Sequence, residues 1–115
     1  MNTCILSQEM AHEALKTPKS FVSEHLRIWR ERRNMIHTGL AELGLDLWRP
    51  EGAFYVFPKA KNSKRMVLDL YKKHRVITYP GGWFGTEDRI RLSYALDIAK
   101  IEEGLQRIKK YLKRR

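Results

Sequence analysis

The sequence has little of several features that restrict what a chain can be. It has one cysteine, Cys4, so no disulfide can form within the chain, which suits a reducing cytoplasm. Its longest apolar runs, such as Ala53–Phe57, are far shorter than the roughly 20 residues that a membrane-spanning helix needs. The segment Met1–Gln8 lacks the basic stretch and apolar stretch of a secretory signal. We therefore expect a cytoplasmic protein with no membrane partner.

Paired metal ligands are also scarce. His12 and Glu13 begin like a zinc-binding helix motif, but Lys16 stands where the second histidine is needed. The remaining histidines lack paired ligand spacing: His25, His37 and His74. No activating group lies near Cys4 in the sequence, so it is expected to be an ordinary helix residue. The sequence therefore predicts no metal site and no cysteine nucleophile.

Positive charge is what the chain has in excess, with 23 lysines and arginines against 13 acidic residues and a net charge of +10. Such a surplus raises affinity for polyanions and for anionic substrates. Much of it lies in Arg27–Arg33 and Lys109–Arg115, two segments with helical periodicity, which favours solvated helix faces. With 115 residues, 43% hydrophobic and 31% charged, the chain fits one globular domain.

Hydrophobic spacing and turn residues predict the order helix, helix, strand, helix, strand, strand, helix. A first helix over Cys4–Lys16 stops at Thr17 and Pro18, and a long second helix is capped by Ser20. That helix reaches about Leu43, before a glycine stop at Gly44. The further strands are expected at Ala53–Phe57, Val76–Thr78 and Arg89–Tyr94, and the further helices at Ser63–His74 and after a capping Asp97.

This order predicts an α+β fold, in which helices pack on one face of a small, mostly antiparallel sheet. No segment of the chain is left to cover the other face. The second helix is long for so small a domain, and a long amphipathic helix can link two domains. The pattern therefore indicates a missing partner.

The strand at Arg89–Tyr94 carries the candidate site. Alternation puts two sets of side chains on opposite faces: Arg89, Arg91 and Ser93 on one, and Ile90, Leu92 and Tyr94 on the other. The apolar set suits the core, so Arg89 and Arg91 are expected to project from the uncovered face. An arginine on a rigid strand can bind a carboxylate through two parallel hydrogen bonds, although strand arginines are more often solvated or structural ion-pair partners.

The loop before this strand, Tyr79–Gly85, contains three glycines, one proline and the aromatics Trp83 and Phe84. This composition predicts a tight loop that holds aromatic side chains in a fixed shape, either exposed or tucked into the core. Its glycines match neither spacing typical of a phosphate-binding loop.

Three segments in this order and spacing resemble the class I/II aminotransferases, the fold-type-I family that includes aspartate aminotransferases. They are Pro50–Tyr55, then Val76-Ile77 leading to Pro80-Gly81 and Phe84-Gly85, and then Ile90–Ala95. The resemblance runs through the whole chain: Phe21-Val22 and Arg30–Arg33 resemble the family's interdomain helix, and Ile101–Leu112 its last helix.

This resemblance implies that residues 1–115 are the C-terminal small domain of an aminotransferase. Residues 1–19 would be the end of a large-domain or linker helix, 20–44 the interdomain helix and 45–115 the α+β core. Arg91 matches the arginine that binds the α-carboxylate of the amino-acid substrate. The family transfers an amino group between an amino acid and a 2-oxo acid, using pyridoxal phosphate bound to a lysine.

The family's Schiff-base lysine lies in a Ser-x-x-Lys segment followed by an arginine near a glycine, and this sequence has no such segment. Ser20 is followed at the third position by Ser23, and Ser63 by Met66. The other cofactor-binding residues belong to the family's large domain. We therefore expect no catalytic or cofactor-binding residue here, and an inactive chain that binds no pyridoxal phosphate alone. The expected partners are a large cofactor-binding domain of the same polypeptide, the amino-acid or oxo-acid substrate, and a second subunit in a homodimer.

Two other interpretations remain open. A basic sheet with an open face and nearby aromatics outlines an RNA-binding module, although the sequence lacks the signature of such sheets, and we expect no nucleic-acid partner. Alternatively, the chain is a stand-alone domain that binds small carboxylates through Arg91 without catalysis.

At Gly82-Trp83 the family more often has smaller residues, which affects the contacts expected next to the substrate.

Overall fold

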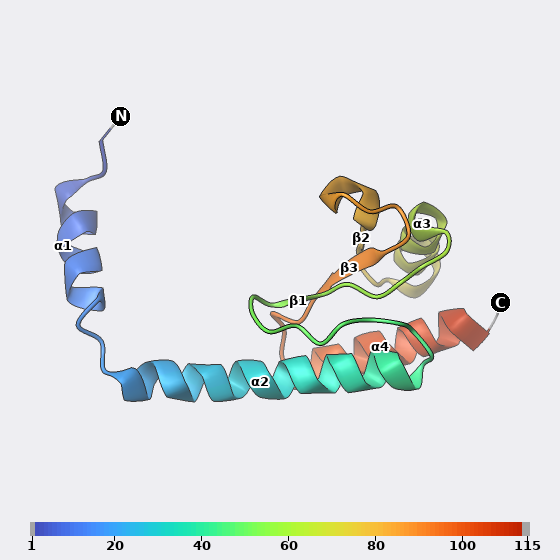
Figure 1. Cartoon of the computed structure of the whole chain (residues 1–115), viewed down its shortest axis with the longest axis horizontal. Helices are drawn as coiled ribbons and strands as arrows, with labels where there is room; N and C mark the ends of the chain where they lie inside the picture. Colours follow the sequence, from blue (N-terminus) through green and yellow to red (C-terminus); the bar gives the residue numbers. More distant parts are fainter. Residues whose placement is uncertain (1, 114–115) are drawn as a thin grey trace.

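The elements follow one another in the predicted order in a computed structural model that describes residues 2–113. Figure 1 shows a long helix lying beneath a small sheet, with the first helix standing apart at its far end. The elements are α1 (Ile5–Ala14), α2 (Lys19–Glu42), β1 (Tyr55–Val56), α3 (Ser63–His74), β2 (Tyr79–Pro80), the 3-10 helix η1 (Gly81–Phe84), β3 (Ile90–Ser93) and α4 (Ile98–Lys113).

The three strands form an antiparallel sheet in the order β1-β3-β2, as the α+β prediction requires. β3 is central: Tyr55 of β1 lies opposite Ser93, and Tyr79 of β2 lies opposite Arg91. Antiparallel neighbours in register bring side chains of one face within contact distance. The register thus gathers residues from all three strands around the middle of β3.

Two predicted strands are wrong in position or length. Residues 76–78 are not a strand, because α3 ends in a left-handed residue, Arg75 (φ 57°), and the Val76 amide still donates to the Leu70 carbonyl. The strand therefore begins only at Tyr79. On the other side, Ala53 has a φ of 56°, which turns the chain and shortens the strand expected at Ala53–Phe57.

The core lies where the helices meet the sheet. α2 packs along α4, and α3 packs against both α4 and β2. The buried apolar residues come from every layer: Ile36 and Leu40 from α2, Val56, Ile90 and Leu92 from the sheet, Met66 and Leu70 from α3, and Ile101, Ile108 and Tyr111 from α4. The helices that cover this sheet confirm the predicted fold class.

The two ends of α2 differ from each other in how well the sequence predicts them. The helix begins at Lys19 rather than after a capping Ser20, because Pro18, with a φ of −58°, precedes the first turn. At the other end Gly44 adopts a φ of 78°, and the amides of Gly44 and Leu45 donate to carbonyls of the last turn. The predicted glycine stop is confirmed.

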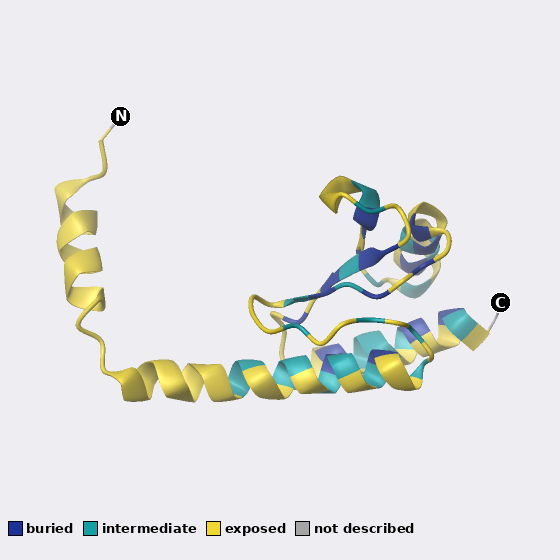
Figure 2. Ribbon diagram, viewed as in Figure 1, coloured by how far each residue is buried: buried dark blue, intermediate teal, exposed yellow. Residues whose placement is uncertain are grey.

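The N-terminal arm, which we define as residues 2–27, is exposed throughout (Figure 2). No residue of α1 is buried, and the buried residues of α2 are Ile36 and Leu40, both in its second half. Large apolar side chains face solvent along this arm: Ile5, Leu6, Met10, Leu15, Phe21, Val22 and Leu26. Of the helices described, none combines the length and apolar character needed to cross a membrane.

Candidate functional site

Arg91 lies in the middle of the central strand, with its side chain on the face opposite the core. Its neighbours Ile90 and Leu92 point the other way and are 1% and 6% exposed. This is the alternation expected for β3, and Arg91 itself is half-buried.

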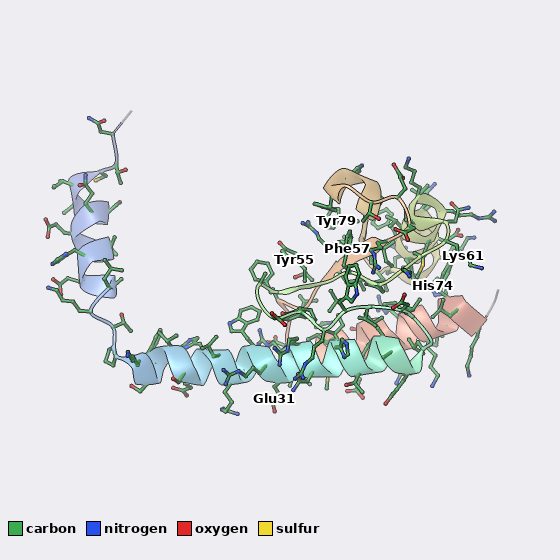
Figure 3. The ribbon with its side chains drawn as sticks, viewed as in Figure 1. Glu31, Tyr55, Phe57, Lys61, His74 and Tyr79 are labelled. Atoms are coloured by element: carbon green, nitrogen blue, oxygen red, sulfur yellow. The ribbon has the colours of Figure 1, made fainter. Side chains whose placement is uncertain are left out.

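Aromatic rings surround the Arg91 guanidinium. Its Cζ atom lies 3.8 Å from the centroid of the Phe84 ring, 4.3 Å from that of Tyr55 and 5.4 Å from that of Tyr79. Tyr55 and Tyr79, labelled in Figure 3, come from β1 and β2, the two strands that flank β3. A cation within about 6 Å of a ring centroid is attracted by the ring's negative face. Arg91 is therefore held by rings from both sides of its strand.

Among the residues described, neither an acidic side chain nor a carbonyl group holds Arg91. Across residues 2–113 its guanidinium makes no ion pair, and its buried Nε–H donates to no protein atom. Other arginines of the chain are paired: Arg107 lies 2.5 Å from a Glu103 oxygen and Arg32 lies 3.1 Å from Asp97. Among the residues described, the Arg91 guanidinium thus has no acidic counter-ion.

The expected exposure of Arg89 is wrong. Its side chain is buried, with a guanidinium nitrogen donating to the Phe57 carbonyl at 2.8 Å and its Cζ 4.0 Å from the Trp48 ring. The indole of Trp48, itself 71% exposed, covers this end of the sheet. Arg89 therefore holds the fold together and does not project from the open face of the sheet.

The Tyr79–Gly85 loop fixes the position of Phe84. The Gly81 amide donates to the Arg89 carbonyl at 2.7 Å, and the Thr86 amide donates to the Gly81 carbonyl at 3.1 Å. The sequence left open whether the loop's aromatics are exposed or buried. Both stay exposed, Phe84 at 41% and Trp83 at 70%, but the Phe84 ring packs on Phe57 and Arg91.

A cavity of about 510 Å³ opens beside Arg91. This volume lies in the range of small-molecule sites. Residues from the sheet line one side of the cavity: Tyr55, Tyr79, Arg91 and Ser93. Lys100, Glu103 and Arg107 of α4 line the other, together with apolar side chains.

Glu103 neutralises part of the basic wall on α4. Its carboxylate accepts a hydrogen bond from Lys100 at 3.1 Å and faces Arg107, and these contacts, led by the Lys100 hydrogen bond, lower the pKa of Glu103. Arg107 also donates to the Arg75 carbonyl at 3.1 Å, which ties α4 to the end of α3. An anion in the cavity would find Arg91 uncommitted, while Lys100 and Arg107 are already paired.

The other residues considered from the sequence lie elsewhere. Cys4 is exposed on the N-terminal arm. The His25 ring contacts Phe21 within α2, and the His74 ring packs edge-on against Tyr111. Asp97 precedes α4, where its backbone carbonyl accepts from the Lys100 and Ile101 amides, while its carboxylate pairs with Arg32 instead of serving as the expected cap. In the part of the chain that the structure describes, no three histidine, cysteine or acidic side chains lie close enough together to hold a metal ion.

The sequence did not identify the rings around Arg91 as part of its site. Tyr55 and Phe84 are 36 and 7 positions away from Arg91, and only the register of β1 against β3 and the folding of the loop bring them together. The alternation of side chains along the strands could have found them. Once the antiparallel pairing is known, it puts Tyr55 and Tyr79 on the same face as Arg91.

Comparison with known proteins gives consistent matches. The family model for aminotransferase class I and II matches residues 1–108. A probable aspartate/prephenate aminotransferase of Aquifex aeolicus is 39% identical over 96% of this chain and 31% of its own length. Aromatic-amino-acid aminotransferase 2 of Thermococcus litoralis is 38% identical over 92% of this chain and 29% of its own length. The crystal structure of an aspartate aminotransferase from Thermotoga maritima superposes with a TM-score of 0.87 at 30% identity, covering 95% of this chain and 28% of that one.

Proposed function

Because the chain belongs to the class I and II aminotransferase family, we propose that it is the C-terminal small domain of a pyridoxal-phosphate-dependent aminotransferase. In this proposal residues 1–19 end a large-domain or linker helix, 20–44 form the interdomain helix and 45–115 form the α+β core. The chain spans 31% and 29% of the length of the two curated relatives described above. A longer polypeptide would supply the large cofactor-binding domain and a second subunit in a homodimer. We propose that this enzyme works in cytoplasmic amino-acid metabolism.

The observation that carries this proposal is the uncommitted charge of Arg91 beside the cavity. We propose that Arg91 binds the α-carboxylate of the amino-acid substrate. A guanidinium can donate two parallel hydrogen bonds to one carboxylate, which fixes both the position and the orientation of the substrate. The rings next to Arg91 would displace part of the water around the ion pair and so strengthen it.

The chemistry of the family needs a lysine that binds pyridoxal phosphate, which serves as an electron sink when bound. Among the residues described, the lysine that lines the cavity is Lys100. Its side chain is 69% exposed, and its ammonium nitrogen lies 3.1 Å from the Glu103 carboxylate in a surface ion pair. These residues do not fit a Schiff-base site. We therefore assign this chain the binding of the substrate carboxylate and assign the cofactor to the large domain.

Replacing Arg91 in the full-length enzyme tests this proposal. Arg91→Ala should raise KM for the amino acid and lower kcat/KM by about 100-fold or more, since a charged, bidentate hydrogen-bonded pair is worth roughly 3 kcal/mol. Arg65→Ala is a matched control, because Arg65 is an exposed arginine of α3 away from the cavity. Steady-state kinetics of both variants decide the matter: an unchanged kcat/KM for Arg91→Ala removes this residue from the site.

The isolated 115-residue chain tests the division of labour. After incubation with pyridoxal phosphate and reduction with borohydride, mass spectrometry should find no single lysine modified stoichiometrically. One fully modified lysine would contradict the assignment of the cofactor to the large domain.

A further inference from the structure

We propose that Phe84 and Tyr55 are positioning residues for Arg91, whose rings hold the guanidinium in its carboxylate-binding orientation in place of an acidic partner. The part that these rings play in the reaction rests on the proposed function, whereas the ordering of Arg91 by the rings does not.

The Arg91 guanidinium is half-buried and has no acidic partner among the residues described. A half-buried charge loses part of its hydration, and proteins commonly compensate this loss with a counter-ion. Arg107 and Arg32 have such partners in Glu103 and Asp97. Within residues 2–113 Arg91 has ring faces at 3.8 and 4.3 Å instead.

An aromatic ring can restrain a guanidinium while leaving its hydrogen-bond donors available, which a carboxylate cannot do. The donors of a guanidinium lie in its plane and point outward along its edge. An aspartate or glutamate would bind that edge and compete with the substrate's carboxylate, whereas a ring contacts the flat face. The two rings therefore restrain the Arg91 side chain without using the hydrogen bonds that a carboxylate needs.

The rings of Tyr55 and Phe84 are themselves fixed by their neighbours. Tyr55 belongs to β1 and is in register with Ser93, and its ring also contacts Phe54 at 4.6 Å. Phe84 ends η1, and its ring packs edge-on against Phe57 at 6.4 Å. The strand order puts β1 on one side of β3 and the segment containing η1 on the other. Rings anchored on both sides can set the direction of the guanidinium.

The isolated chain allows a direct test by NMR of the Arg91 Nε–H group. In the unaltered chain this group should be ordered, and ring currents should shift its proton resonance upfield. Phe84→Leu keeps apolar volume but removes the ring, so the order should fall to that of an exposed arginine such as Arg65, and the shift should diminish. Phe84→Tyr keeps the ring and should preserve both signals. Backbone spectra and melting temperatures of both variants report whether the fold is retained.

Tyr55→Leu and Tyr55→Phe repeat the test from the other side of β3, which keeps the proposal testable if Phe84→Leu fails to fold. An Arg91 Nε–H that stays ordered in folded leucine variants overturns the proposal. Equal loss of order in Phe84→Tyr also overturns it, because the ring face is then not the cause.

Kinetics of the full-length enzyme link this ordering to the reaction. Phe84→Leu should raise KM for the amino acid by roughly tenfold, the effect of losing a partly desolvated cation–π contact, and change kcat by less than about threefold. Phe84→Tyr should restore KM. A fall in kcat at unchanged KM would contradict the positioning role. If Arg91→Ala leaves the kinetics unchanged the proposed function fails, and the NMR result still decides whether the rings order Arg91.

Discussion

At the scale of single residues, Arg89 and Arg91 show how two equivalent positions acquire different roles. They lie two residues apart on one face of the same segment, and alternation alone treats them alike. Arg89 is covered by Trp48 and donates to the Phe57 carbonyl, whereas Arg91 is flanked by rings that leave its donors free. The difference arises from what crosses each end of the sheet, which depends on residues far away in the sequence.

Gly81 is the residue on which the position of Phe84 depends. A Cβ atom added at Gly81 would lie 2.6 Å from the Arg89 carbonyl oxygen, which is backbone and cannot move away cheaply. We expect Gly81→Ala to destabilise the chain by about 1–3 kcal/mol, in the range of overpacked sites, and to displace the loop. Gly104→Ala is the control, because a Cβ there meets no atom within 4 Å. Urea unfolding of both variants measures the effect, and equal stability for the two would contradict the expectation.

The sequence predicted the structure correctly where local rules decide it. Alternation predicted the faces of β3, and Gly44 predicted the end of α2, since a left-handed residue suits glycine. It failed where partners distant in sequence decide. The left-handed Arg75 and Ala53 are not residues that favour this conformation, so the shifted start of β2 and the short β1 had no local signal. The family was recognised from three short segments in the right order and spacing, and the family model confirms it. The role of Arg91 stays a prediction.

At the scale of elements, α4 joins the other helices. It packs along α2 and against α3, and Arg107 donates to the carbonyls of His74 and Arg75 at the end of α3. A cation at the C-terminus of a helix stabilises the carbonyls that lack partners within the helix. Glu103 in turn holds Arg107 and Lys100. The triad of Lys100, Glu103 and Arg107 thus lines the cavity and, through Arg107, links α4 to the end of α3.

The triad predicts a dependence of stability on pH. The pKa of Glu103 is lower in the folded chain, mainly through its hydrogen bond from Lys100 and its proximity to Arg107, so the folded state binds fewer protons than the unfolded state in the acid range. The contribution is therefore present at neutral pH and lost as pH falls below the ordinary carboxyl range of about 4. Glu103→Gln should lower the urea midpoint at pH 7 and have little effect near pH 3.

Glu102→Gln is the matched control for this prediction, because Glu102 is the exposed neighbour on α4 and makes no ion pair with the residues described. A Glu103→Gln variant whose loss of stability is the same at both pH values would show that the charge of Glu103 is not responsible.

At the scale of the whole molecule, the chain has a packed part and an unpacked arm. The core residues occur from Ile36 onward, while the N-terminal arm, residues 2–27, exposes several large apolar side chains and buries none. A helix without tertiary packing is marginal in water, because its stability comes mostly from burying an apolar face. The arm therefore has the character of a surface that a partner covers.

Hydrogen exchange should reveal this division. Amides of α1 and of the first turns of α2 should exchange within about tenfold of the rate of an unstructured chain, whereas amides near Leu40 and Ile108, both at most 2% exposed, should exchange at least about 100-fold more slowly. Measuring at two dilute concentrations separates this from protection by self-association. Concentration-independent protection of α1 equal to that of α4 would contradict the prediction.

The length of α2 has a mechanical consequence. Its 24 residues extend about 36 Å, and its packed second half belongs to the same body as the sheet that carries Arg91. A tilt of this helix by about 5° displaces its far end by about 3 Å, about the length of one hydrogen bond. Under the proposed function, a partner that binds the exposed part of α2 would therefore bring Arg91 to the substrate's carboxylate, or withdraw it, by rotating the packed part as one body. The sheet and the rings around the guanidinium would not need to change shape.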